Sequence, residues 1–151
     1  MSTQIDITEN GTTTLATAGK YCDRNIDVNV NVPSYDDELV DVSITEFVNS
    51  TVESIGVYGL GYKGKLKKID VSNVKSIGQN AFYNNRVLDT LIIRTPEVCV
   101  LTTTTGVFKN TKIESGTGYI YVPDDLVESY KAATNWATYA SQIKSISELG
   151  E

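Results

Sequence analysis

The hydrophobic positions of this chain follow three different periods, and each period predicts a different kind of structure. Over residues 26–32, Ile and Val alternate with Asp and Asn, which is typical of a half-buried β-strand that Pro33 ends. Over residues 126–143, apolar residues recur at steps of three or four and predict an amphipathic helix, which Thr134-Asn135 can break in two. The region between these segments follows a longer period.

The middle of the chain contains an internal repeat of 22 residues. Residues 52–56 read Val-Glu-Ser-Ile-Gly, and residues 74–78 read Val-Lys-Ser-Ile-Gly. In a looser third copy, the Phe and Asn of residues 82–84 return at residues 108–110, and the threonines inserted at 102–105 leave its strand register open. One such unit cannot bury its own apolar residues, so the repeat predicts units that stack on one another.

Stacked units would share one continuous core. Apolar residues would align with their counterparts 22 positions later, Leu66 with Leu88 and Ile69 with Leu91. The glycine that follows each Ser-Ile pair frees the backbone to turn. The predicted repeat core consists of Ile55, Leu60, Leu66, Ile69, Val71, Ile77, Phe82, Leu88, Leu91, Ile93 and Phe108.

The first 33 residues predict a small antiparallel module of their own. Ile5 and Ile7 alternate with polar neighbours, Asn10-Gly11 is a strong tight-turn signal, and residues 12–15 can return as a second strand. The predicted organisation is therefore an N-terminal β attachment module (1–33), a linker and entry strand (34–51), a leucine-rich-repeat-like core (52–118) and a C-terminal strand with a helical cap (119–151).

The composition favours β structure. Thr, Val and Ile make up about a third of the chain, and β-branched side chains fit a pleated surface better than a helix. The predicted fold class is mainly β with a minor α part, namely a β-hairpin arm, a short leucine-rich-repeat-like solenoid and a helical cap.

The charge and the missing residue types exclude several classes of function. The chain has no histidine, which removes the commonest general base and the commonest metal ligand. Its net charge of −6 argues against binding to nucleic acid, and no apolar run approaches the ~20 residues that cross a bilayer. The N-terminus lacks the pattern of a secretory signal. We therefore expect a protein without enzymatic activity, cofactor or metal, and without a nucleic-acid or membrane partner.

Two further features carry little chemistry. Cys22 and Cys99 cannot form a metal site by themselves, and the sequence leaves open whether they pair or stay as two reduced thiols. The acidic residues of the linker do not follow the spacing of an EF-hand, so we expect a solvated loop rather than a calcium site. These residues are Asp36, Asp37, Glu38 and Asp41.

The charges are unevenly distributed along the chain. Residues 61–113 carry nine basic and three acidic side chains, whereas residues 1–60 and 114–151 are both acidic overall. Such blocks indicate either a solvated basic face or contact between copies of the chain. Within the basic block, a cluster with nearby tyrosines is either a solvated turn or a surface for an anionic partner. This predicted partner surface consists of Lys63, Lys65, Lys67, Lys68, Tyr58 and Tyr62.

The aromatic residues near the C-terminus also leave two interpretations. Tyr130, Trp136 and Tyr139 lie on the predicted helical stripe. They could form an exposed aromatic binding face, or they could cover the open end of the repeat array, which terminal repeats require.

Several segments resemble BspA-like leucine-rich repeats. The resemblance lies in the units at residues 54–56, 76–85 and 88–93 and in the tail at residues 118–123, 130–133 and 135–136. Residues 7–12 and 26–33 are similar to a β-module of structural proteins from phages and prophages of Gram-positive bacteria. Large surface proteins of this family carry many repeats behind a signal peptide, whereas this chain shows about three units and no such signal.

The resemblance implies a non-enzymatic phage virion structural protein: a capsid decoration, a head fibre, or a baseplate or tail component. Its N-terminal arm would mount it on the particle, and its repeats would be presented outward. The alternative is a host-surface or glycan-binding adhesin module. The implied partners are further copies of the chain, other virion proteins and a host cell-surface glycan. The implied location is the virion, assembled in the cytoplasm of a bacterial host, or else the bacterial cell surface.

Overall fold

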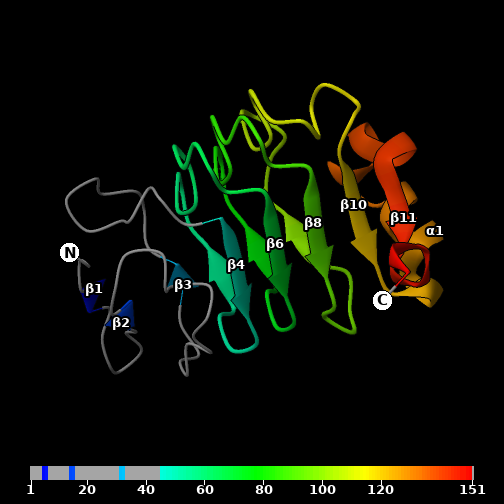
Figure 1. Ribbon diagram of the computed structural model, residues 1–151. Coiled ribbons are helices and arrows are strands. Elements are labelled where there is room, and N and C mark those ends of the chain that lie inside the picture. Colours follow the sequence, from blue (N-terminus) through cyan, green and yellow to red (C-terminus); the bar gives the residue numbers. More distant parts are fainter. Residues whose placement is uncertain (1–4, 7–13, 16–30, 33–44, 151) are drawn as a thin grey trace.

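The computed structural model describes residues 5–6, 14–15, 31–32 and 45–150, and these form two parallel β-sheets with short helices at the C-terminal end (Figure 1). The larger sheet has five strands in the order β11-β10-β8-β6-β4. Its strands are β4 (Glu46–Asn49), β6 (Lys68–Val71), β8 (Thr90–Ile93), β10 (Tyr119–Val122) and β11 (Ile143–Ser145).

The second sheet has four short strands in the order β3-β5-β7-β9. These strands are β3 (Asn31–Val32), β5 (Ser54–Ile55), β7 (Ser76–Ile77) and β9 (Val100–Leu101). Two further strands, β1 (Ile5–Asp6) and β2 (Thr14–Leu15), pair antiparallel, as a hairpin requires. Because β3 pairs with β5, the end of the segment predicted as a separate module (1–33) is part of the second sheet.

The 22-residue period sets the strand register. Ile69 of β6 lies beside Leu91 of β8, and Ser54 of β5 lies beside Ser76 of β7. Each unit therefore contributes one strand to each sheet. The offset changes between β8 and β9: Val71 still lies beside Ile93, 22 residues further along, whereas the partner of Ser76 in β9 is Val100, which is 24 residues further along. The inserted threonines at 102–105 follow β9 and do not cause this change.

All eleven residues of the predicted repeat core are buried, with at most 1 % of each exposed. In the strands of the larger sheet, buried residues alternate with partly exposed ones along β4, β6 and β10. The rings of Phe82 and Phe108 lie 5.4 Å apart in neighbouring units. The core therefore runs between the two sheets from one unit to the next.

The C-terminal region is built as a strand–helix–strand crossover. The chain leaves β10, passes through the helices and returns as β11, which pairs parallel with β10. Parallel neighbours need such a long connection because a tight turn cannot reverse the chain direction twice. The helices are η2 (Asp124–Leu126), α1 (Val127–Ala132) and η3 (Trp136–Gln142), and η4 (Ile146–Leu149) follows β11.

The predicted fold class, mainly β with a leucine-rich-repeat-like solenoid, is wrong. The structure is a mixed α/β fold with two parallel sheets and a few short helices. The prediction weighed the β-branched residues of the whole chain, whereas the strands are only two to four residues long. It also placed Ile143 on a helical stripe, although Ile143 begins β11 and completes the crossover. The helix does break at Thr134-Asn135, because Asn135 adopts a left-handed φ of 69°.

Some predictions concern residues outside the described ranges. These are the tight turn at Asn10-Gly11, Cys22, Pro33 and the acidic loop of residues 36–41. Within the part of the chain that the structure describes, no helix is long and apolar enough to span a bilayer.

Candidate functional site

Each repeat unit returns from the second sheet through a turn that contains two left-handed residues, four positions apart. The turns follow the same hydrogen-bond pattern: Tyr62 N donates to Tyr83 O, and Asn84 N donates to Lys109 O, both at 2.8 Å. The left-handed pairs are Tyr58 with Tyr62, Asn80 with Asn84, and Gly106 with Asn110, all with φ between 55° and 64°. These pairs are therefore equivalent positions in successive units.

The residue types at these positions differ in conformational cost. Glycine has no Cβ to clash in the left-handed region, and asparagine tolerates this region better than most residues. Tyrosine tolerates the left-handed region poorly, and this backbone conformation costs a bulky residue on the order of 1 kcal/mol or more. Tyr58 and Tyr62 thus occupy positions where the other units carry Asn or Gly. Backbone strain of this kind is often retained where the side chain has a function.

The two strained tyrosines form a surface cluster with Tyr83 of the next unit. The rings of Tyr58 and Tyr62 are stacked, with centroids 5.7 Å apart and planes inclined by 29°. The Tyr83 ring lies 5.4 Å from Tyr62 and 5.6 Å from Tyr58, edge-on to the latter. Tyr62 is 39 % exposed, and the other two are half-buried. We call these three residues the tyrosine cluster.

The neighbouring rings affect the acidity of Tyr62. Partial desolvation, followed by the hydroxyls of Tyr58 and Tyr83, raises the pKa of Tyr62 above its ordinary value. The predicted partner surface includes Tyr58 and Tyr62 but not Tyr83. Its position could have been found from the 22-residue register, which places residue 62 beside residue 84 of the next unit.

The predicted basic partner surface is only partly at the surface. Lys63 is fully buried, and its Nζ donates a hydrogen bond of 3.0 Å to the carbonyl oxygen of Gly61. Its backbone N–H donates to Oδ1 of Asn85 at 2.8 Å. Lys63 is therefore part of the interior and not of a partner surface. The run of four lysines gave no sign of this, because a charged residue is expected outside.

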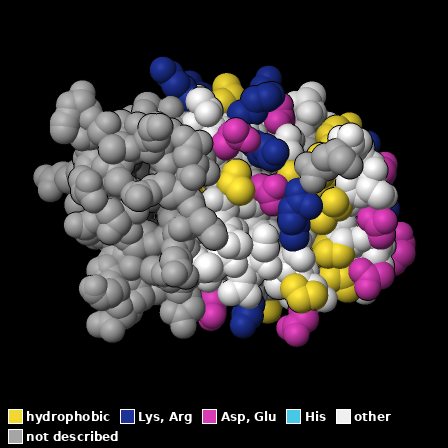
Figure 2. Space-filling view, turned by 60° about the horizontal axis from the view of Figure 1, so that its bottom comes forward, with side chains coloured by type: hydrophobic (Ala, Val, Ile, Leu, Met, Phe, Trp, Pro, Cys, Tyr) yellow, Lys and Arg dark blue, Asp and Glu magenta, His cyan; other side chains and the backbone are white. Residues whose placement is uncertain are grey.

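The remaining basic residues of this region are partly neutralised. Lys67 forms an ion pair with Asp89, and Lys68 lies 3.8 Å from Glu46, whereas Lys65 is exposed. In Figure 2, Lys and Arg side chains lie among Asp and Glu side chains over the middle of the described surface. The basic block thus offers less free positive charge than its composition suggests.

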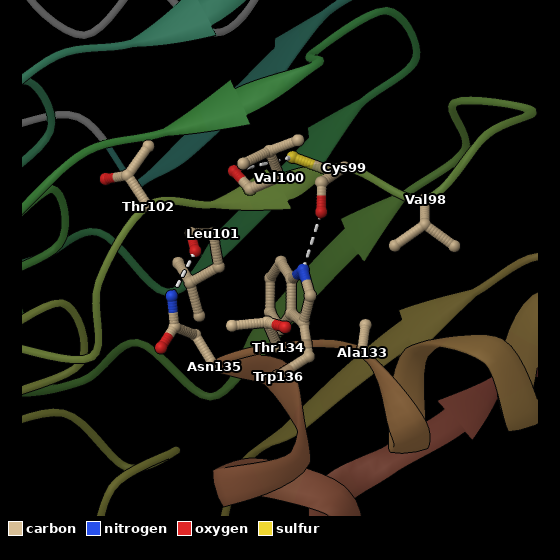
Figure 3. A pocket seen from close by; sticks show the side chains of 9 residues that line it. All are labelled: Val98, Cys99, Val100, Leu101, Thr102, Ala133, Thr134, Asn135 and Trp136. Atoms are coloured by element: carbon tan, nitrogen blue, oxygen red, sulfur yellow. Dashed lines mark hydrogen bonds between the residues drawn. The ribbon is translucent and has the colours of Figure 1, made fainter.

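A second surface feature is a pocket of about 330 Å³ beside β9, the edge strand of the second sheet (Figure 3). Its wall is mostly apolar, and Val100 is 58 % exposed there. The lining residues come from β9 and its flanks, from the segment that leads into η3 and from the first residue of η3: Val98, Cys99, Val100, Leu101, Thr102, Ala133, Thr134, Asn135 and Trp136.

Side chains from the crossover bond outward backbone groups of β9 and of Cys99, the residue before it. Trp136 Nε1 donates to the carbonyl oxygen of Cys99, and Asn135 Nδ2 donates to that of Leu101, both at 2.6 Å (Figure 3). The backbone N–H of Cys99 donates to the Tyr130 hydroxyl oxygen at 2.8 Å. These bonds block an added strand, which an open sheet edge would otherwise accept.

This arrangement decides between the two interpretations of the C-terminal aromatic residues. Trp136 and Tyr130 are fully buried, and Tyr139 packs partly buried against Phe108. They cover the edge of the second sheet and do not form an exposed aromatic face. Burial also raises the pKa of the free Cys99 thiol to about 12, which keeps it protonated and unreactive at neutral pH.

No family model, curated protein or solved structure matches the chain. The resemblance to BspA-like repeats therefore stays a prediction. Among the described residues, no three potential ligands lie close enough together to hold a metal ion. The surface with the most distinctive chemistry is the tyrosine cluster.

Proposed function

We propose that this chain is a non-enzymatic structural protein of a bacteriophage virion. The observation that carries the proposal is the difference between the two ends of the second sheet. At β9 the sheet edge is blocked by Tyr130, Asn135 and Trp136. At the other end, the sheet includes β3, from the segment that resembles a phage attachment module. The end that carries β3 is thus suited to attaching the chain to a phage particle, and the repeat units would extend outward from that particle.

The proposal is tested on purified phage particles from a host strain that carries the gene. Mass spectrometry should detect the chain in particles, and gold-labelled antibodies should place it on the head or the tail in electron micrographs. A chain that is found in the lysate but not in the particles would refute the proposal.

We also propose that copies of the chain associate through their opposite charge blocks. Residues 61–113 are basic overall and residues 114–151 are acidic overall. In Figure 2, acidic side chains gather toward the end of the molecule that carries the C-terminal elements. Complementary patches of this kind favour association, and salt screens them.

At low salt, light scattering should give a mass above the 16.5 kDa of a single chain, and added salt should lower that mass. A mass of one chain at low salt would contradict this prediction. A mass above that of one chain that does not change with salt would indicate that the copies associate through apolar surface and not through their charges.

The tyrosine cluster favours a second candidate function, a module that binds the surface of the host cell. Exposed aromatic side chains provide rigid contact area at a small entropic cost, which is why they are common in binding surfaces. Fluorescently labelled protein should then bind whole host cells and should be displaced by excess unlabelled protein. Absence of saturable binding to any strain that the phage infects would count against this function.

A further inference from the structure

We infer that the tyrosine cluster binds an uncharged sugar ring of a glycan; this rests on the second candidate function and names its ligand class. A pyranose ring presents C–H groups on its faces and hydroxyls around its edge. A tyrosine presents the matching pattern, an apolar ring with a polar hydroxyl at its tip. The cluster offers three such rings, with all centroids between 5.4 and 5.7 Å apart.

The turn of the repeat does not require tyrosine at either left-handed position. The positions of Tyr58 and Tyr62 correspond to Asn80 and Asn84 in the next unit, which folds into the same turn with residues that tolerate the left-handed backbone. The turn therefore forms without tyrosine. The first unit retains two strained residues that the second unit does without, and strain of this kind points to a role for the side chain.

The three rings are held in place before any ligand arrives. Tyr62 donates its backbone N–H to Tyr83 O at 2.8 Å, and Tyr58 donates to Gln79 O at 3.3 Å. These bonds connect the turns of two units and fix the backbones that carry all three rings. The half-burial of Tyr58 and Tyr83 further restricts their rotation. A pre-ordered surface loses less entropy on binding a small ligand.

The charges near the cluster favour an uncharged glycan over an acidic one. Two lysines of the same unit are already matched by carboxylates, Lys67 by Asp89 and Lys68 by Glu46. A third, Lys63, is buried and bonded to Gly61 O, which leaves Lys65 as the remaining lysine of the unit, and it is exposed. Next to Tyr83 in the chain, the side-chain oxygen of Asn84 accepts from Asn110 Nδ2 at 3.2 Å and from Arg86 Nε at 3.3 Å. Amides can bond sugar hydroxyls without requiring a charge.

The test uses the full chain with isotope-labelled tyrosine rings, observed by nuclear magnetic resonance. The probes are four soluble hexasaccharides. Three are uncharged, namely maltohexaose, cellohexaose and N-acetylated chitohexaose, and the fourth, the hyaluronan hexasaccharide, is acidic. At about 10 mM, at least one uncharged probe should shift the ring signals of all three residues of the cluster, because weak single-site sugar binding is of millimolar order.

The decisive variant replaces the two strained residues by the residue that the next unit uses, Tyr58→Asn with Tyr62→Asn. Affinity should fall at least about tenfold, because two aromatic contacts are lost. The melting temperature should not fall, because the strain is relieved. This pairing of lost binding with retained stability separates a ligand site from a merely structural cluster. The single variant Tyr62→Asn carries the same test if the double variant fails to fold.

The matched control is Tyr121→Thr on β10, where Tyr119 and Tyr121 form another tyrosine pair, at 6.4 Å. This variant should bind the probe like the parent chain. No shift with any uncharged probe, binding of hyaluronan alone, or undiminished binding by the double variant would each overturn the inference. If no probe binds but the chain is present in virions, the inference is overturned and the virion proposal stands. If a sugar binds but the chain is absent from virions, the virion proposal is refuted and the inference stands.

Discussion

Replacing Trp136 by Ala is expected to lower the free energy of unfolding by about 4 kcal/mol, the largest effect of any single substitution considered for this chain. The indole ring is fully buried and lies edge-on to Tyr130 at 5.3 Å. Its removal leaves a cavity beside β9 and takes away the donor to the carbonyl oxygen of Cys99. Urea unfolding followed by circular dichroism measures the change, because Trp136 is the only tryptophan and its fluorescence is lost.

The control for this prediction is Trp136→Phe, which keeps most of the apolar volume and loses the N–H. It should cost about 1–3 kcal/mol, the range for leaving one buried polar group without its partner. If Trp136→Ala and the parent chain unfold at the same urea concentration, the C-terminal helices do not hold the edge of the second sheet. If Trp136→Phe costs as much as Trp136→Ala, the hydrogen bond rather than the packing dominates.

Asn85→Ala is expected to lower the free energy of unfolding by about 3 kcal/mol. Asn85 is fully buried, and its side chain connects two units: Oδ1 accepts from Lys63 N at 2.8 Å, and Nδ2 donates to Leu60 O at 2.6 Å. Its truncation removes both hydrogen bonds from buried backbone groups, and the loss of a buried hydrogen bond of this kind costs about 1–3 kcal/mol. Because Leu60 and Lys63 flank Tyr62, the same variant should broaden the ring signals of the tyrosine cluster.

The chain supplies a matched control at Asn73, whose Nδ2 also donates to a carbonyl of the preceding unit, that of Thr51. This bond is longer, at 3.4 Å, and the residue is half-buried. Asn73→Ala should therefore cost less than about 1 kcal/mol. Equal losses for the two asparagines would contradict the account of Asn85 as a buried link between units.

Some of this structure could be predicted from the sequence because periodicity reports burial directly. The 22-residue repeat identified residues that are all buried, and it gave the register that brings Ile69 beside Leu91. The prediction of the fold class was wrong for a different reason. The C-terminal pattern fits a helix locally, but the pairing of Ile143 with Ile120 across a crossover depends on long-range contact.

The candidate site was predicted less well than the core, for reasons that are also physical. Lys63 and Asn85 are polar residues whose side chains are buried with hydrogen bonds to the backbone, and hydrophobic patterning expects both at the surface. Tyr83 joins the cluster only through the register of two units. The strain at Tyr58 and Tyr62 is a property of the backbone and becomes visible only when their φ angles are compared with those of the equivalent asparagines.

The measurement that tests the central claim most directly is the nuclear Overhauser effect between side chains of successive units. The account predicts cross-peaks between the ring protons of Tyr62 and Tyr83, and between the methyl groups of Ile69 and Leu91, because stacking in register brings both pairs together. A well-dispersed spectrum of a folded chain that lacks both sets of cross-peaks would contradict the stacking of the units and, with it, the shared surface that their tyrosines form.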